Sequence, residues 1–142
     1  MKLSSRADYA AKAMLELSLN PDRPVTLAYL ARLQDISISY LEQIFAQLRK
    51  HDLVKSVRGP GGGYVLNKPL SEISIGDIVN SIDNHANKTA EQGTMDETHQ
   101  LWDQLSQSVY RHLSTVSLQD IHDAAHKSND ENDENDEHIV AA

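Results

Sequence analysis

SISYLEQIFAQLRK (residues 37–50) and, two residues further on, LVKSVRGPGGGYVLN (residues 53–67) decide the fold of this 142-residue chain. In the first segment the apolar residues recur at i, i+3, i+4 and i+7, which predicts a helix whose buried face is Leu41, Ile44, Phe45 and Leu48. Ser37 or Ser39 can cap its N-terminus. The second segment holds two β-rich runs around a run of glycine and proline, and this pattern predicts a hairpin with a permissive tip.

Two more helices are expected before these segments. The sequence Ser5-Arg6-Ala7-Asp8 fits a capping box that begins the first helix, whose apolar face is Tyr9, Ala13, Met14 and Leu17. Two prolines end it within the segment 20–24. The second helix starts after Thr26, with Leu27, Leu30, Ala31 and Leu33 inward. Helices followed directly by a hairpin form the order of a winged helix-turn-helix, so we predict a mainly α fold with a small β-hairpin.

Three further helices are expected downstream. Ser74 and Asp77 frame a capping box, before a helix with Ile75, Ile78, Val79 and Ile82 inward. Thr98 is the predicted cap of a longer helix, and Ser117 with Asp120 is the predicted capping box of a last short one. The long helix carries an apolar set that predicts either core or a dimer seam: Leu101, Trp102, Leu105, Val109 and Leu113.

Composition limits the class of protein. The absence of cysteine excludes disulfides, thiolate nucleophiles and cysteine-ligated zinc or iron–sulfur sites. No stretch approaches the ~18 apolar residues of a membrane helix, and the N-terminus has no signal-peptide block, so we expect a cytoplasmic protein without membrane contact. The net charge of -8 is unevenly divided, because residues 1–70 hold ten Lys/Arg against six Asp/Glu and residues 71–142 hold three against fifteen. The basic half is the one that can face phosphate.

The helix at 37–50 has the properties of a recognition helix, whose N-terminal residues enter the major groove of DNA. Glu42 is the informative residue, because a carboxylate near phosphates lowers affinity and can serve specificity by accepting from a cytosine N4 amine. The alternative is an acid placed in the first helical turn by the helix dipole. The surrounding motif favours the base-reading interpretation.

The glycine-rich run at 59–63 also has two interpretations. After a helix-turn-helix it forms a wing that approaches the DNA backbone or minor groove, with Arg58 inserted where the potential is most negative. As the phosphate-binding loop of a nucleotide-handling enzyme it needs a Lys-Ser/Thr pair and then a helix, and the sequence has neither. We therefore predict a DNA-binding protein that is not an enzyme.

Together these motifs resemble the IscR family of iron–sulfur cluster regulators. The resemblance rests on residues 37–45, 48–50 and 57–64, and it extends from about Leu3 to Ile121. It implies a dimeric winged-helix repressor or activator, with dimerisation through the long helix at about 99–115. The predicted DNA-binding residues are Ser37, Ser39, Tyr40, Glu42, Gln43, Arg49, Lys50, Arg58, Gly59 and Pro60. The predicted dimerisation residues are Leu101, Trp102, Leu105, Val109 and Leu113.

The chain departs from that family where sensing is done. Family members hold a [2Fe–2S] cluster on three cysteines and a histidine before the long helix, and here only His99 matches, so we predict no cluster and no other cofactor. His122 and His126 lie at i and i+4, where a polar helix face is the simpler interpretation. A loose set of metal ligands matches no defined spacing, and a solvated loop is the simpler interpretation of it: His85, Glu91, Asp96, Glu97 and His99.

Four segments result from these predictions. They are a winged helix-turn-helix DNA-binding domain (1–83), a shortened sensor-type loop (84–98), dimerisation helices (99–127) and a disordered acidic tail (128–142). The tail can bind a basic partner or compete with DNA, and a solvating extension is the simpler interpretation. The predicted function is sequence-specific transcription regulation by a homodimer on double-stranded promoter DNA. The alternative is a regulator gated by another ligand, a metal or a partner protein.

Overall fold

The computed structural model describes residues 4–83 and 97–128. Helices α1 (Ser5–Leu19), α2 (Leu27–Gln34) and α3 (Ile38–Lys50) come first, followed by the hairpin strands β1 (Val54–Val57) and β2 (Gly63–Leu66). A 3-10 turn η1 (Leu70–Glu72), α4 (Ile75–Asp83) and the long α5 (Glu97–Thr115) come next, and a last helix covers 118–128. The strands pair antiparallel as a two-stranded sheet. The prediction of a mainly α fold with a small hairpin is confirmed.

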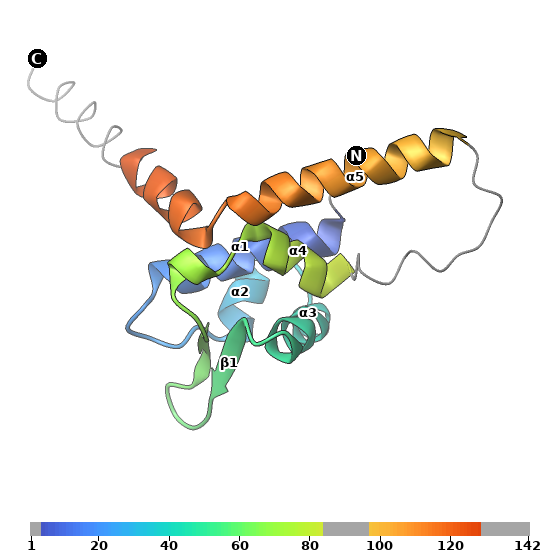
Figure 1. Ribbon diagram of the computed structural model, residues 1–142. Helices are drawn as coiled ribbons and strands as arrows, with labels where there is room; N and C mark the ends of the chain where they lie inside the picture. The colour runs from blue at the N-terminus through green and yellow to red at the C-terminus, as the bar shows by residue number, and fades with distance from the viewer. Residues whose placement is uncertain (1–3, 84–96, 129–142) are drawn as a thin grey trace, which may run out of the picture.

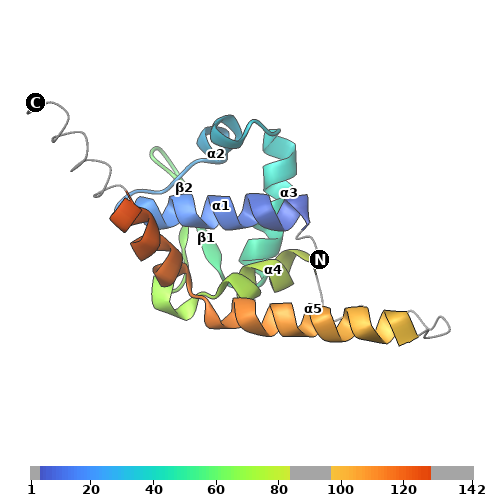
Figure 2. The same ribbon diagram turned by 90° about the horizontal axis from the view of Figure 1, so that it is seen from above.

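The helices α1 to α4 gather around one core, as Figures 1 and 2 show, with the hairpin below them and α5 along the opposite side. The first half of α5 extends past this body in both views. Phe45 and Met14 are the largest fully buried side chains of the core, and Leu118 of the last helix is buried among them. The core therefore joins the N-terminal helices to a residue that follows α5.

The N-cap of the first helix lies one residue before the predicted one. Ser4 is the N-cap of α1, because its Oγ accepts from the backbone N–H of Ala7 at 3.1 Å. The same hydroxyl donates to Asp83 Oδ1 at the end of α4 at 2.5 Å, a tertiary contact that the local pattern does not contain. Asp8 pairs with Lys12 at 2.9 Å instead of closing a capping box. The predicted box at Ser5 is therefore wrong.

Leu33 of α2 was predicted to face the core, and in the structure it faces solvent. Leu33 is 54% exposed, whereas Leu30 and Ala31 are buried. The inward stripe runs through Leu27, Leu30, Ala31 and Gln34, and at 100° per residue Leu33 falls about 110° from the middle of that stripe. The Gln34 amide donates to the Tyr9 carbonyl at 3.3 Å, so a polar side chain occupies the position expected of an apolar one.

The N-caps of three later helices lie where the sequence predicted them. Ser37 caps α3, and reciprocal hydrogen bonds form the capping boxes of Ser74 with Asp77 and of Ser117 with Asp120, so these predictions are confirmed. Thr98 is not a cap, because α5 already begins at Glu97. Residues 84–96 of the predicted loop and residues 129–142 of the predicted tail lie outside the described residues.

Candidate nucleic-acid interface

Helix α3 presents two opposed faces. Leu41, Ile44, Phe45 and Leu48 are 0% exposed, which fixes the helix to the core. The opposite face is exposed and carries the polar residues predicted to read DNA: Ser39, Glu42, Gln43, Arg49 and Lys50. The structure therefore brings these side chains onto one solvent-facing surface, where a major groove can receive them.

Two residues at the start of α3 have defined orientations. The Ser37 hydroxyl accepts from the Tyr40 N–H at 3.1 Å, so its own hydrogen remains available to a ligand. Tyr40 is half-buried, and its ring meets Tyr9 of α1 edge-on with centroids 5.8 Å apart. This contact with α1 restricts the orientation of the Tyr40 ring.

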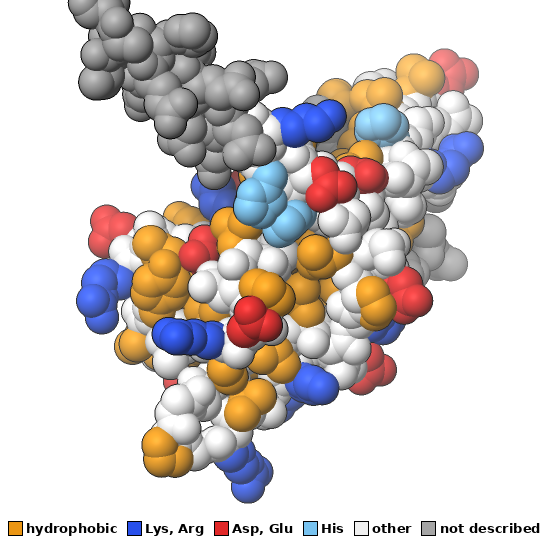
Figure 3. All heavy atoms as spheres, turned by 90° about the vertical axis from the view of Figure 1, so that its left-hand side faces the viewer, with side chains coloured by type: hydrophobic (Ala, Val, Ile, Leu, Met, Phe, Trp, Pro, Cys, Tyr) orange, Lys and Arg blue, Asp and Glu red, His pale blue; other side chains and the backbone are white. Residues whose placement is uncertain are grey.

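The loop between β1 and β2 is the wing, residues 58–62. Arg58, Gly59 and Pro60 are all exposed in it, so they are accessible to a ligand. Gly59 (φ 97°) and Gly61 (φ 74°) adopt left-handed backbone that other residues rarely tolerate, and the Gly62 N–H donates to the Gly59 carbonyl at 2.9 Å. On the face shown in Figure 3 the wing forms the lower tip, and a Lys or Arg side chain stands at its end.

The wing is attached to the segment between α1 and α2, a contact that sequence reasoning missed. Val25 and Tyr64 exchange two backbone hydrogen bonds of 3.0 and 2.8 Å. A Cβ on Gly63 (φ 154°) would lie 2.5 Å from the Val25 carbonyl oxygen, so only glycine permits this approach. Tyr64 also packs on Phe45 with ring centroids 4.7 Å apart. This aromatic contact therefore joins the base of the wing to α3.

The charges on this side of the molecule suit a polyanion. The side chains of Arg49, Lys50, Lys55 and Arg58 are exposed, and within the described ranges 4–83 and 97–128 none of them forms an ion pair. The Glu42 carboxylate is likewise exposed and unpaired within the same ranges. The Glu42 carboxylate is therefore an available acceptor on the exposed face of α3, which also carries Arg49 and Lys50.

Helix α2, which precedes the turn leading to α3, is attached to α1 by a side-chain hydrogen bond. The Tyr29 hydroxyl donates to Glu16 Oε1 at 3.3 Å, and the negative charge of Glu16 raises the pKa of Tyr29. The turn to α3 passes through Asp35 in a left-handed conformation (φ 54°), and the Ile36 N–H donates to the Ala31 carbonyl at 3.1 Å. This short, closed turn gives the two helices the arrangement of a helix-turn-helix.

Helix α5 leaves much of its apolar set in solvent. Leu101, Trp102 and Leu105 are 66%, 53% and 49% exposed, whereas Val109 and Leu113 are half-buried and Leu113 packs against the core. Leu101, Leu105 and Val109 recur every four residues, so they form one stripe.

No helix within the described residues is long and apolar enough to cross a membrane.

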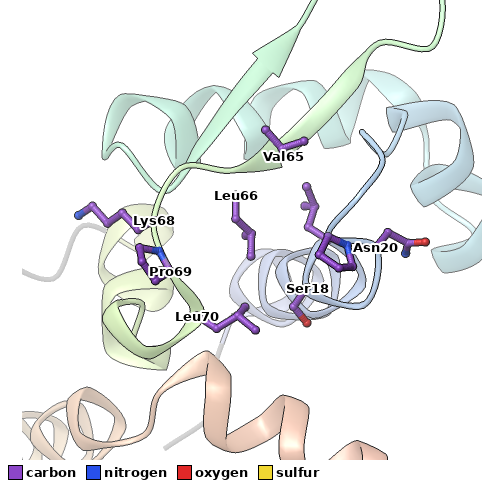
Figure 4. Close-up of a pocket in the computed structure, with 9 residues that line it drawn as sticks. Ser18, Asn20, Val65, Leu66, Lys68, Pro69 and Leu70 are labelled. Carbon is purple, nitrogen blue, oxygen red and sulfur yellow. The ribbon is translucent and has the colours of Figure 1, made fainter.

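A shallow pocket of about 190 Å³ lies between the end of α1, β2 and the segment leading to η1 (Figure 4). Val65, Leu66 and Leu70 give it an apolar lining. The Ser18 hydroxyl at its edge is already bound to the Leu15 carbonyl at 2.5 Å. The pocket is smaller than the ~300–1,000 Å³ usual for small-molecule sites.

In the part of the chain that the structure describes, no three His, Asp or Glu side chains gather as metal ligands.

A helix-turn-helix with an exposed polar second helix, flanked by a glycine-tipped hairpin, defines a winged-helix DNA-binding protein. Residues 3–124 match the model of the Rrf2 family, described as iron-dependent transcriptional regulators. The chain belongs to the Rrf2 family and is a DNA-binding transcription regulator.

Relatives and solved structures agree with this assignment. A putative HTH-type transcriptional regulator of Haemophilus influenzae is 43% identical over 85% of this chain and 86% of its own length. The HTH-type transcriptional regulator IscR of Klebsiella pneumoniae is 43% identical over 85% and 79%. Among solved structures, T. potens IscR aligns with a TM-score of 0.74 at 32% identity over 90% of both chains. CymR, the global cysteine regulator of B. subtilis, aligns with a TM-score of 0.73 at 29% identity over 87% and 98%.

Proposed function

We propose that this protein binds a promoter operator as a homodimer, with α3 in the major groove and the wing against the backbone or minor groove. The observation that carries the proposal is the exposed face of α3, where polar side chains stand beside cations that have no ion-pair partner within the described residues. Ser39, Glu42 and Gln43 read base edges. Arg49, Lys50 and Arg58 contact phosphate, and Gly59 and Pro60 let the wing approach closely.

The dimer is inferred from the stripe on α5. Exposed apolar side chains on one helix face mark a surface that is covered by another protein. A second copy of the same stripe covers it if two α5 helices pack against each other, which brings Leu101, Trp102, Leu105, Val109 and Leu113 of both chains together. A two-fold dimer then presents two recognition helices to two half-sites about one helical turn, ~34 Å, apart.

Iron–sulfur sensing does not fit the donor atoms of this chain. Protein-held iron–sulfur clusters require at least some cysteine thiolates, and none of the 142 residues is cysteine. His99 alone matches the ligands of the cluster-binding relatives that the motifs resemble. We therefore propose a regulator that binds DNA without a cluster, although its family is described as iron-dependent. Gating by another ligand or by a partner protein is the alternative.

An enzymatic role has no support in the described residues. The glycine run connects two strands instead of a strand and a helix, so it lacks the geometry of a nucleotide phosphate loop. We infer that the protein is not an enzyme. We also place it in the cytoplasm, because its proposed ligand is promoter DNA.

Selection from a pool of random DNA duplexes tests the proposal. The full chain, prepared without air, should enrich a sequence with two-fold symmetry, and sedimentation should show two chains on one duplex. Iron content and visible absorbance are measured on the same preparation. A colourless, iron-free protein that binds the selected duplex supports the proposal. A brown preparation that loses binding on iron removal would show that the cluster-free interpretation is wrong, and failure to enrich any sequence would remove specific DNA binding.

A further inference from the structure

Helices α4 and α5 cross at one glycine. Gly76 is buried in the first turn of α4, and a Cβ built there would lie 2.9 Å from both the Cα and the backbone N of Ser114 and would also overlap its hydroxyl oxygen. Ordinary contacts of a Cβ are 3.4–4 Å. Two backbones therefore meet here at a distance that only glycine permits.

Backbone hydrogen bonds fix the segments on either side of this crossing. The Ile75 N–H donates to the Val116 carbonyl at 2.9 Å, and the Leu118 N–H donates to the Ile73 carbonyl at 2.7 Å. Ser74 and Ser117 face each other in the resulting antiparallel bridge. Leu118 and Ile73 are both 0% exposed. The end of α5 is thus attached to the DNA-binding body by a short clamp, residues 73–75 with 116–118, and the first half of α5 extends past the body (Figure 2).

We propose that Gly76 is a positioning residue that sets the angle at which α5 leaves the body, and through it the separation of the two recognition helices in the dimer. The proposal rests on the homodimer of the proposed function. It goes beyond that function because it assigns the half-site spacing of the operator to a residue outside both the DNA surface and the apolar stripe. Glycine is otherwise unfavourable in a helix, so its presence in α4 has a packing reason.

The expected displacement follows from the geometry. An alanine at position 76 must move Ser114 away by about 0.5 Å to restore ordinary contact. Ser114 lies three residues, about 4.5 Å along the helix, from the clamp at Ser117, so α5 tilts by about 6°. The start of α5 lies about 30 Å from the clamp and moves by about 3 Å. In a two-fold dimer both bodies swing, and only the part of each swing along the line that joins the recognition helices changes their separation, so we expect a change of about 3 Å, or about one base-pair step.

The absence of cysteine allows a direct measurement. Ala46 is exposed on α3, so Ala46→Cys carries a single spin label and the dimer gives one distance between recognition helices. Gly76→Ala in this background should shift that distance by about 3 Å, whereas the control Asn80→Ala, on the same helix, should leave it unchanged. In unlabelled protein, Gly76→Ala should move the preferred half-site spacing by about one base pair and keep the half-site sequence. A purely structural role for Gly76 would lower stability without changing that spacing.

Two further variants keep the proposal falsifiable. If Gly76→Ala does not fold, Ser114→Leu crowds the same crossing from a position on α5 that is exposed. If the labelled parent shows no distance between chains, the homodimer is wrong. The tilt is then measured within one chain, between labels at Ala46→Cys and Asp103→Cys. The proposal is overturned if the folded variants keep the parent distance and spacing, or if Gly76→Ala only raises the melting temperature, as alanine does in an unconstrained helix.

Discussion

The contact between the wing and Val25 gives the sharpest prediction, because it depends on a single missing side chain. Gly63→Ala places a Cβ 2.5 Å from the Val25 carbonyl oxygen and 2.7 Å from the carbonyl carbon. Both atoms are backbone, so neither can turn aside. The strand must move away, and the two hydrogen bonds between Val25 and Tyr64 are lost or stretched. We expect the wing to detach from the body while the α-helical core persists.

The cost has two parts. Each hydrogen bond contributes roughly 0.5–1.5 kcal/mol, so the bridge contributes about 1–3 kcal/mol. A residue with a side chain at this backbone conformation (φ 154°) adds strain of about 1–3 kcal/mol. Gly63→Ala should therefore lower the free energy of unfolding by roughly 2–6 kcal/mol, a large share of the ~5–15 kcal/mol typical of a small domain.

Gly61→Ala is the matched control. Gly61 also has a left-handed backbone (φ 74°), but a Cβ there meets nothing within 4 Å. Gly61→Ala should therefore lower the free energy of unfolding by the backbone strain alone, about 1–2 kcal/mol, and it should leave the bridge between Val25 and Tyr64 intact. Alanine restricts the unfolded chain equally in both variants, so this effect cancels in the comparison. The difference between the two variants is chiefly the contribution of the bridge.

Urea denaturation followed by circular dichroism measures the stability of both variants, and fluorescence anisotropy with labelled operator measures DNA affinity. Gly63→Ala should lose more stability than Gly61→Ala, and it should weaken DNA binding under conditions where the protein remains folded. Equal unfolding free energies for the two variants would show that the Val25 bridge does not hold the wing. A destabilised variant with full DNA affinity would show that the wing needs no fixed base.

Three other variants test the proposed surfaces. Arg58→Ala should weaken binding to all sequences and lower the salt slope by up to about one unit, and an unchanged slope with unchanged affinity removes Arg58 from the contacts. The double change Leu105→Asp and Val109→Asp should give monomers that do not bind the operator, so a variant that sediments as a dimer places the seam elsewhere. Glu42→Ala should lower the ratio of specific to non-specific affinity by roughly 5- to 150-fold, because a base contact is lost and phosphate repulsion is relieved. Competition between the operator and a cytosine-substituted duplex measures that ratio. If Glu42→Ala distinguishes the two duplexes as well as the parent protein does, Glu42 only solubilises the helix and does not read a base.

Much of the fold could be predicted because its signals are local. The i, i+3, i+4, i+7 pattern of α3 marks the four residues that are fully buried, and the caps at Ser37, Ser74 and Ser117 lie where short-range hydrogen bonding requires them. Two errors were local, because Leu33 lies away from the inward stripe of α2 and α5 begins before Thr98, whereas the cap of α1 also involves a distant segment. The hydroxyl of Ser4, the observed cap of α1, also donates to Asp83, which is 79 residues away in the sequence, and no local pattern indicates that contact.

The candidate site divides in the same way. The exposed face of α3 and the tip of the wing follow from local periodicity and glycine content. The bridge from Val25 to Tyr64 and the crossing at Gly76 join segments 39 and 38 residues apart, and no local pattern indicates them. One signal was available for Gly76, since a glycine inside a predicted helix implies a close approach. Its partner on α5 can be identified only in the folded chain.

A protein with a net charge of -8 can bind a polyanion if its charges are separated in space as well as in sequence. The cations of α3 and the wing lie on one side of the body, and α5 with the helix 118–128 lies on the other (Figure 1). Helix α4 packs against both α3 and α5, and packed helices lie about 10 Å apart from axis to axis, so α3 and α5 are about 20 Å apart. Interactions between exposed charges are screened over about 8 Å at physiological ionic strength, so phosphates at α3 experience the nearby cations far more than the acids of α5 and of the helix 118–128. The salt dependence of binding should therefore report the local cations Arg49, Lys50 and Arg58, and it should be insensitive to the net charge of the chain.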